Sequence, residues 1–108
     1  MLQCQMEQTG RWLTVYLTGE IDHYGAGQVR ACIDSRILEV GPERVILDLS
    51  GVGFMDSSGI GLILGRRRLL QTLGADLTVR GVGGQVASLL RIAGIQSEEK
   101  TGGARHES

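Results

Sequence analysis

A strand followed by a helix start occupies the middle of the chain and limits the folds open to it. Residues 45–49 (Val-Ile-Leu-Asp-Leu) are a nearly continuous apolar run, which is typical of a strand covered on both faces in an α/β sheet. Glycines 51 and 53 permit a turn after this strand. The segment 56–58 (Asp-Ser-Ser) then offers side chains that accept hydrogen bonds from an opening helical turn. A sheet with helices packed on it is therefore predicted.

Strand and helix signals alternate on both sides of this unit. Two strands with alternating apolar side chains flank a tight turn at Thr9-Gly10, and a first helix follows them. The second helix ends near Gly74, a strand spans residues 75–80, and a third helix begins after residues 81–84. This order predicts an α/β fold, with a single mixed sheet of about four to five strands and helices packed on it. The apolar positions behind these predictions are Leu2, Cys4, Met6, Leu13, Val15, Leu17, Ala26, Val29, Ile33, Ile37, Val40, Val86, Leu89, Leu90 and Ala93.

Length and composition narrow the class of protein. A chain of 108 residues fits one domain, which we place at residues 1–95. In residues 96–108, charges and glycines replace the apolar pattern, so this tail is predicted to be disordered. The net charge of −1 predicts neither nucleic-acid binding nor membrane binding. No apolar run approaches a membrane span, and no signal-peptide pattern is present. Cys4 and Cys32 lack metal-type spacing, which favours a reduced, cytoplasmic protein.

Catalytic motifs do not fit the chain. The segment around Ser57 lacks the glycine two residues before the serine that a nucleophile elbow requires, and no histidine is placed as its base. Residues 59–61 lack the third glycine of a dinucleotide fingerprint and the lysine of a phosphate loop. Residues 81–84 begin a similar pattern, but a valine stands where its third glycine should fall. We therefore predict no enzyme, and we assign no catalytic, metal or cofactor-binding residues.

The helix starts have two interpretations. Asp56, Ser57 and Ser58 can simply cap the second helix, as Asp22 can cap the first. Alternatively, a serine hydroxyl at a helix N-terminus can carry a phosphate, because the free N–H groups and the helix dipole favour negative charge there. The spacing alone does not choose between these interpretations. His23 could be a metal ligand, but a lone histidine beside a helix start is more often polar surface.

One side of the second helix is rich in glycine. Apolar residues occupy more than half of its helical wheel, and Ser57 points close to the remaining arc, whereas Ser58 is expected to point away from it. Either a partner approaches the backbone closely along this arc, or the glycines seat the helix against its own sheet or first helix. The arc consists of Gly61, Gly65, Arg68 and Thr72.

Two further features also have alternative interpretations. Trp12, Tyr16 and Thr18 share one face of a strand, which indicates either an edge strand with one buried face or a ligand site. Residues 66–68 (Arg-Arg-Arg) are either a solvated patch or a site that attracts an acidic partner or a phosphate.

Two segments together resemble one protein family. Residues 54–66 (Phe-Met-Asp-Ser-Ser-Gly-Ile-Gly-Leu-Ile-Leu-Gly-Arg) resemble the phosphorylation segment of bacterial anti-sigma factor antagonists. Residues 17–23 (Leu-Thr-Gly-Glu-Ile-Asp-His) resemble a second segment of that family, at a similar separation. Its members are single STAS domains, and the sporulation type is the nearest. The resemblance implies a STAS fold, phosphorylation of Ser57, and a place for Asp22 near that serine at the partner-facing end of the sheet.

The resemblance also implies partners. The unphosphorylated form is expected to bind an anti-sigma factor with serine kinase activity and so to release a sigma factor. The kinase would transfer a phosphoryl group from ATP to Ser57, and a metal-dependent serine phosphatase would remove it. Two alternatives are a scaffold module in a stress-signalling assembly and a STAS domain that binds a nucleotide or another small ligand. The residues expected at the partner interface are Asp22, His23, Asp56, Ser58, Gly59, Gly61, Gly65 and Arg68.

The end of the chain departs from the family pattern. Members of the family usually continue with another strand and a C-terminal helix, whereas no apolar pattern for either follows Ile95. Part of the usual packing is therefore expected to be missing, which concerns the stability of the fold more than the serine site.

Overall fold

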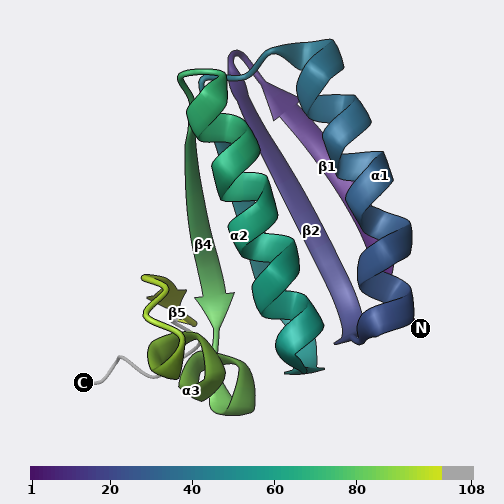
Figure 1. Ribbon diagram of the computed structural model, residues 1–108, viewed down its shortest axis with the longest axis vertical. Coiled ribbons are helices and arrows are strands. Elements are labelled where there is room, and N and C mark those ends of the chain that lie inside the picture. The colour runs from purple at the N-terminus through teal and green to yellow at the C-terminus, as the bar shows by residue number, and fades with distance from the viewer. Residues whose placement is uncertain (101–108) are drawn as a thin grey trace.

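The computed structural model describes residues 1–100 as a five-stranded sheet with three helices (Figure 1). The strand order is β1-β2-β3-β4-β5, with β1 antiparallel to β2 and all other neighbours parallel. This confirms the predicted α/β fold with a mixed sheet. In chain order the elements are β1 (Gln3–Thr9), β2 (Trp12–Ile21), α1 (His23–Val40), β3 (Arg44–Met55), α2 (Ser57–Thr72), β4 (Asp76–Val82), α3 (Gly84–Ile92) and β5 (Glu98–Glu99).

The predicted hairpin is present, but the edge of the sheet lies elsewhere. Gly10, with φ of 60°, makes the turn between β1 and β2. Because β2 also pairs with β3, it is an inner strand, and the expectation that it lies at an edge is wrong. The exposure of Trp12 and the partial exposure of Tyr16 have another reason. Helices α1 and α2 lie on one face of the sheet (Figure 1). Trp12 and Tyr16 alternate with the buried side chains of β2 and therefore take the other face.

The core lies between the sheet and its helices. Val45, Leu47 and Leu49 of β3 belong to the main cluster of buried apolar side chains, together with the inward residues of β2, α1 and α2. Ile46 and Asp48 alternate to the opposite face and are also buried, although Ile46 is not part of that cluster. The side chains on both faces of β3 are thus buried as predicted, but the main apolar cluster covers only one of these faces. On the second face, the flanking strands β2 and β4 shield the central strand.

β3 is longer than predicted and runs directly to the serine segment. The turn expected at Gly51 and Gly53 is absent, since β3 continues to Met55 with two register shifts against β2. Gly51 is needed for close approach between strands, because a Cβ there would lie 2.9 Å from Thr18 Oγ1. Strand β3 therefore carries Asp56 and Ser57 to the end of the sheet without an intervening loop.

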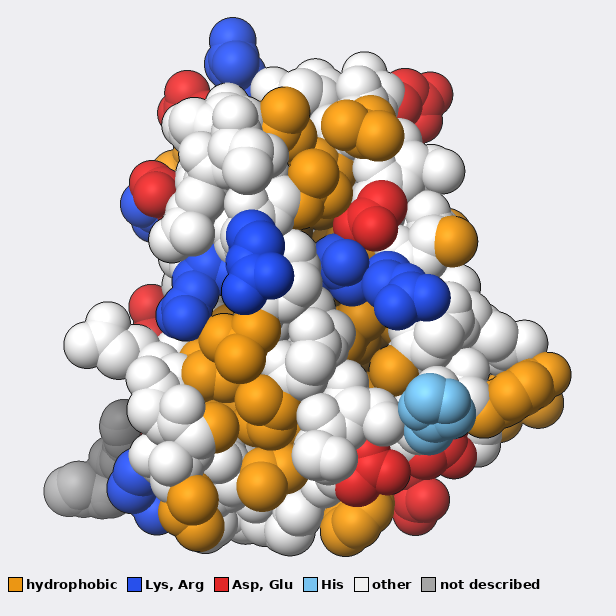
Figure 2. All heavy atoms as spheres, viewed as in Figure 1, with side chains coloured by type: hydrophobic (Ala, Val, Ile, Leu, Met, Phe, Trp, Pro, Cys, Tyr) orange, Lys and Arg blue, Asp and Glu red, His pale blue; other side chains and the backbone are white. Residues whose placement is uncertain are grey.

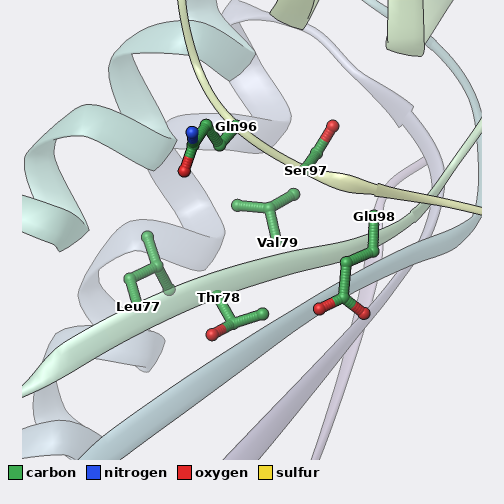
Figure 3. A pocket seen from close by; sticks show the side chains of 6 residues that line it. All are labelled: Leu77, Thr78, Val79, Gln96, Ser97 and Glu98. Atoms are coloured by element: carbon green, nitrogen blue, oxygen red, sulfur yellow. The ribbon is translucent and has the colours of Figure 1, made fainter.

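The described chain continues beyond the predicted domain boundary at residue 95. Glu98 and Glu99 form β5 beside the end of β4, and Lys100 N donates to Val82 O at 2.8 Å. Strand β5 is formed by backbone pairing of two exposed residues, so the sequence contains no apolar pattern that predicts it. Residues 101–108 of the predicted tail lie outside the described part of the chain. Because β5 covers only the end of β4, an open hollow of about 460 Å³ remains beside Leu77–Val79 (Figure 3).

Candidate functional site

Two helices begin side by side at the carboxyl ends of β2 and β3. Asp22 caps α1, its Oδ1 accepting from Gly25 N at 2.7 Å, and Asp56 caps α2, its Oδ1 accepting from Ser58 N at 2.8 Å. The strand ends are joined, because Asp56 N donates to Ile21 O at 3.2 Å. Both predicted caps are confirmed, and the sheet places the two carboxylates at the same end of the molecule.

Ser57 is the first residue of α2 and is exposed to solvent. The first four N–H groups of a helix have no partner within the helix, so this end of α2 carries partial positive charge. A phosphate on the Ser57 hydroxyl would lie in that favourable field. The Asp22 and Asp56 carboxylates would oppose it, so the helix terminus compensates only part of the added charge.

Ser58 does not point away from the glycine arc as expected. It is half-buried and lines a groove between α1 and α2 together with Gly61. At 100° per residue the arc spans the angle between Ser57 and Ser58, so both serines border it and the helical wheel does not favour either one. The choice of Ser57 over Ser58 therefore depends on its greater exposure and on the family resemblance.

The glycines of α2 differ in their surroundings. Gly59 is buried, and a Cβ at this position would lie 2.7 Å from Met55 Sδ, so Gly59 seats the helix on the end of β3. Gly61 and Gly65 have open space where a Cβ would project. The interpretation that glycines seat the helix by packing therefore applies to Gly59, which lies outside the glycine arc, and not to Gly61 or Gly65. Gly61 and Gly65 leave an unobstructed stretch of helix surface.

The groove between α1 and α2 has a volume of about 320 Å³. His23 is exposed and lies at the end of the groove nearest Ser57. Among residues 1–100, no three His, Cys, Asp or Glu side chains are grouped as metal ligands. Its lining comes from His23, Ala26, Gly27 and Arg30 of α1 and from Ser58, Gly61 and Leu62 of α2.

The three consecutive arginines of α2 do not form one solvated patch. Arg67 and Arg68 are exposed, but Arg66 is only 8% exposed and lies against α1, with its Nε 2.7 Å from Asp34 Oδ1. The two atoms are close enough for an ion pair but are not aligned for a hydrogen bond. Burial lowers the pKa of Arg66, Asp34 opposes that effect and nearby Arg30 adds to it. Arg68, placed in the partner surface from the sequence, lies on the exposed side of α2.

Gln85 was missed by the sequence reasoning. This first-turn residue of α3 holds the backbone of Met55 at two points: its Oε1 accepts from Met55 N at 3.1 Å, and its Nε2 donates to Met55 O at 2.8 Å. The amide thus acts as a neighbouring strand would, one residue before the Asp56 cap. Nothing in the local sequence around Gln85 signals this contact, because its partner is 30 residues away.

Charged side chains are unevenly distributed over the face that carries α1 and α2. Figure 2 shows basic side chains gathered across its middle, and the histidine and several acidic side chains nearer the end where the two helices begin. No helix in the described part of the chain is long and apolar enough to cross a membrane.

Comparisons with known proteins agree with this architecture. A family model described as "STAS domain" matches residues 3–107. An anti-sigma F factor antagonist of Paenibacillus polymyxa is 39% identical over 94 residues, which cover 87% of this chain and 80% of that protein. The structure of the anti-sigma factor antagonist SpoIIAA in its unphosphorylated form has a TM-score of 0.78 at 29% identity, covering 88% of this chain and 87% of that one. For the Bacillus SpoIIAA in its phosphorylated form the TM-score is 0.71 at 28% identity, covering 88% and 90%.

Proposed function

Since this chain belongs to the STAS-domain family of anti-sigma factor antagonists, which are regulators and not enzymes, we propose that it is a phosphorylation switch acting on an anti-sigma factor. In this proposal the unphosphorylated form binds an anti-sigma factor that has serine kinase activity, and a sigma factor is released. The kinase transfers the phosphoryl group of ATP to Ser57 Oγ, and a metal-dependent serine phosphatase removes it. Binding, phosphorylation and dephosphorylation take place in the cytoplasm, and the chain needs no cofactor of its own.

The observation that carries this proposal is the setting of Ser57. Its side chain is exposed at the start of α2, beside the adjoining caps Asp22 and Asp56 and one turn from the open backbone at Gly61. A relative has solved structures in both phosphorylated and unphosphorylated forms, which supports phosphorylation as the variable that is switched.

The mechanism follows from charge and space at this position. Phosphorylation adds about −1.5 to −2 charges and three acceptor oxygens. The N-terminus of α2 stabilises added negative charge, so the fold survives. A partner surface docked over Ser57, in contrast, meets the bulk of the phosphate and must remove its water. Without that water, the repulsion between the phosphate and the Asp22 and Asp56 carboxylates of this chain is stronger. The modification therefore blocks the interface and leaves the domain folded.

The test compares single-residue variants of the serine segment. With the cognate kinase and ATP, phosphopeptide mapping should place the label on Ser57, and Ser57→Ala should abolish labelling, whereas Ser58→Ala retains it. Ser57→Ala should stay within about 0.5 kcal/mol of the parent stability, as is usual for exposed positions. It should bind the anti-sigma factor, and a folded Ser57→Asp should bind it poorly. Label that persists in Ser57→Ala, or equal affinities of the Ala and Asp variants by calorimetry, would contradict the proposal.

A further inference from the structure

The groove between α1 and α2 is open along its length and closed at its far end. Gly27 on α1 and Gly61 on α2 both have empty space where a Cβ would project, so the backbones of both helices are accessible. The buried side chains of Ala26 and Leu62 form its floor. One turn beyond Leu62, Arg66 reaches across to Asp34 and closes the groove. We call this feature, with its lining residues and its Arg66–Asp34 end, the α1–α2 groove.

Positive charge at the closed end exceeds the negative charge that faces it. Arg30 lines the groove, is exposed and makes no ion pair within residues 1–100. Arg66 is 92% buried, and its Nη1 is enclosed without a hydrogen-bond partner in the described chain. Among residues 1–100, Asp34 is the one carboxylate paired with Arg66, and Arg30 is near enough to disfavour the charged form of Arg66. Within the described chain, two guanidinium groups thus lie near one another, and only that of Arg66 is paired with a carboxylate.

The other end of the groove has the opposite sign. Asp22 and Asp56 lie where the helices begin, and Figure 2 shows acidic side chains at that end and basic ones across the middle of the face. From Ser58 to Arg66 is eight residues, or about 12 Å along α2 at the rise of an α-helix. A partner that covers Ser57, one residue earlier, therefore needs to extend about two and a half helical turns to reach Arg30 and Arg66.

We propose that the α1–α2 groove receives a carboxylate side chain of the anti-sigma factor, held by Arg30 beside the Arg66–Asp34 pair. This inference rests on the proposed function and specifies the chemistry of its partner. A carboxylate is the group that matches the shortage of negative charge, and a guanidinium binds it through two parallel hydrogen bonds. The open glycines let the partner backbone approach closely enough for a short acidic side chain to reach. The contact also fixes the direction in which the partner lies along α2.

Charge reversal at two arginines tests the proposal. Arg30→Glu removes the docking cation and supplies Arg66 with a carboxylate from the chain itself, so the groove is filled from within. Arg67→Glu is the matched control: it makes the same change of charge one residue after Arg66, on an exposed side chain turned about 100° away. Arg30→Ala is a second variant that removes the cation without adding a carboxylate. Thermal melts establish that all three are folded, and the Arg30 variants should melt at or above the parent temperature because a repulsion is removed.

Affinity for the anti-sigma factor is then measured by calorimetry, with every protein unphosphorylated. Arg30→Glu should bind at least about tenfold more weakly than the parent, Arg30→Ala should be intermediate, and Arg67→Glu should stay within about twofold. If the parent binds and both reversals weaken binding equally, the groove proposal is wrong while the proposed function stands. If the parent itself does not bind, the proposed function fails too.

A titration with inorganic phosphate covers a different occupant. One outcome is that phosphate binds the parent but not Arg30→Ala, while the affinity for the anti-sigma factor is the same for both proteins. The groove would then be a site for a small anion, and the proposal would be overturned. If phosphate instead competes with the anti-sigma factor for binding to the parent, and does not compete for binding to Arg30→Ala, the groove proposal is supported.

Discussion

At the scale of single residues, the glycines of α2 do two different things. A Cβ at Gly59 would lie 2.7 Å from Sδ and 3.1 Å from Cβ of Met55, which is fully buried. A Cβ at Gly61 or Gly65 would project into open space, so the internal packing does not require glycine at either position. Their presence in an otherwise good helix costs roughly 1 kcal/mol each relative to alanine. A surface that keeps two such residues gains accessibility of its backbone, which is what a docking partner uses.

Two alanine substitutions in the same helix should therefore have opposite effects. Gly65→Ala should raise the free energy of unfolding by up to about 1 kcal/mol, because helix propensity improves and no atom is displaced. Gly59→Ala should lower it by roughly 1 kcal/mol or more, since overpacking against Met55 exceeds the gain in propensity. Urea denaturation of both variants measures the difference. A bulkier Gly65→Leu should also keep the parent melting temperature. Destabilisation by either substitution at Gly65 would show that this side of α2 is packed.

At the scale of elements, the serine segment is held from three sides. β2 pairs with the end of β3, Asp56 caps α2, and Gln85 ties α3 to Met55. The last contact replaces strand pairing at a point where the pairing of β3 with β4 has already ended, at Asp48 and Arg80. A single amide side chain thus determines whether the residue before the Asp56 cap has its hydrogen bonds. Gln85 is a positioning residue, because it acts on Ser57 only through Met55.

Replacing this amide should loosen the start of α2. Gln85→Leu leaves Met55 N–H and C=O without their partner, so the free energy of unfolding should fall by about 1–3 kcal/mol. Hydrogen exchange at the Met55 amide should become faster, and Gln85→Glu, which keeps the acceptor but loses the donor, should retain part of the protection. Ser88→Ala, at an exposed position of the same helix, is the control. Unchanged protection of Met55 in Gln85→Leu would show that strand pairing alone positions the segment.

At the scale of the whole molecule, the ion pair between Asp48 and Arg80 joins the neighbouring parallel strands β3 and β4 on the face away from the helices. Asp48 Oδ2 accepts from Arg80 Nε at 2.9 Å, and its Oδ1 accepts from Ser50 N at 2.9 Å and from Ser50 Oγ at 2.6 Å. Burial would raise the pKa of Asp48, but the hydrogen bonds from Ser50 and Arg80 outweigh burial and hold that pKa below its ordinary value. This coupling makes the stability of the domain depend on pH.

The sign of the pH dependence follows from the lowered pKa. The native state favours ionised Asp48 more than the unfolded state does, so its contribution is complete above the unfolded pKa of about 3.9 and disappears as the pH falls through the lower native pKa. Unfolding free energies from pH 7 down to pH 2 should therefore fall more steeply for the parent than for Asp48→Asn. Parallel curves for the two proteins would contradict a contribution from this carboxylate.

The sequence alone determined the features that depend on neighbours a few residues away. Alternation of apolar side chains located the hairpin and β4, spacings of three and four located the helices, and Asp22 and Asp56 were identified as caps because each binds an N–H within its own first turn. The position of Ser57 at the start of α2 follows from the same local rules. The strand-helix order then led to the α/β fold.

Only the tertiary structure decided which similar residues have different roles. Arg66 is buried and Arg67 is exposed within one basic run, because Asp34 of another helix faces Arg66 whereas Arg67 points to solvent. Gly59 and Gly61 differ because Met55 lies under one of them only. Partners far along the chain likewise determine three other features: the extension of β3, the two-residue strand β5 and the hydrogen bonds between Gln85 and Met55. Periodicity and capping report on a residue's own helix or strand, whereas burial, close approach and charge pairing depend on which segments the fold places opposite it.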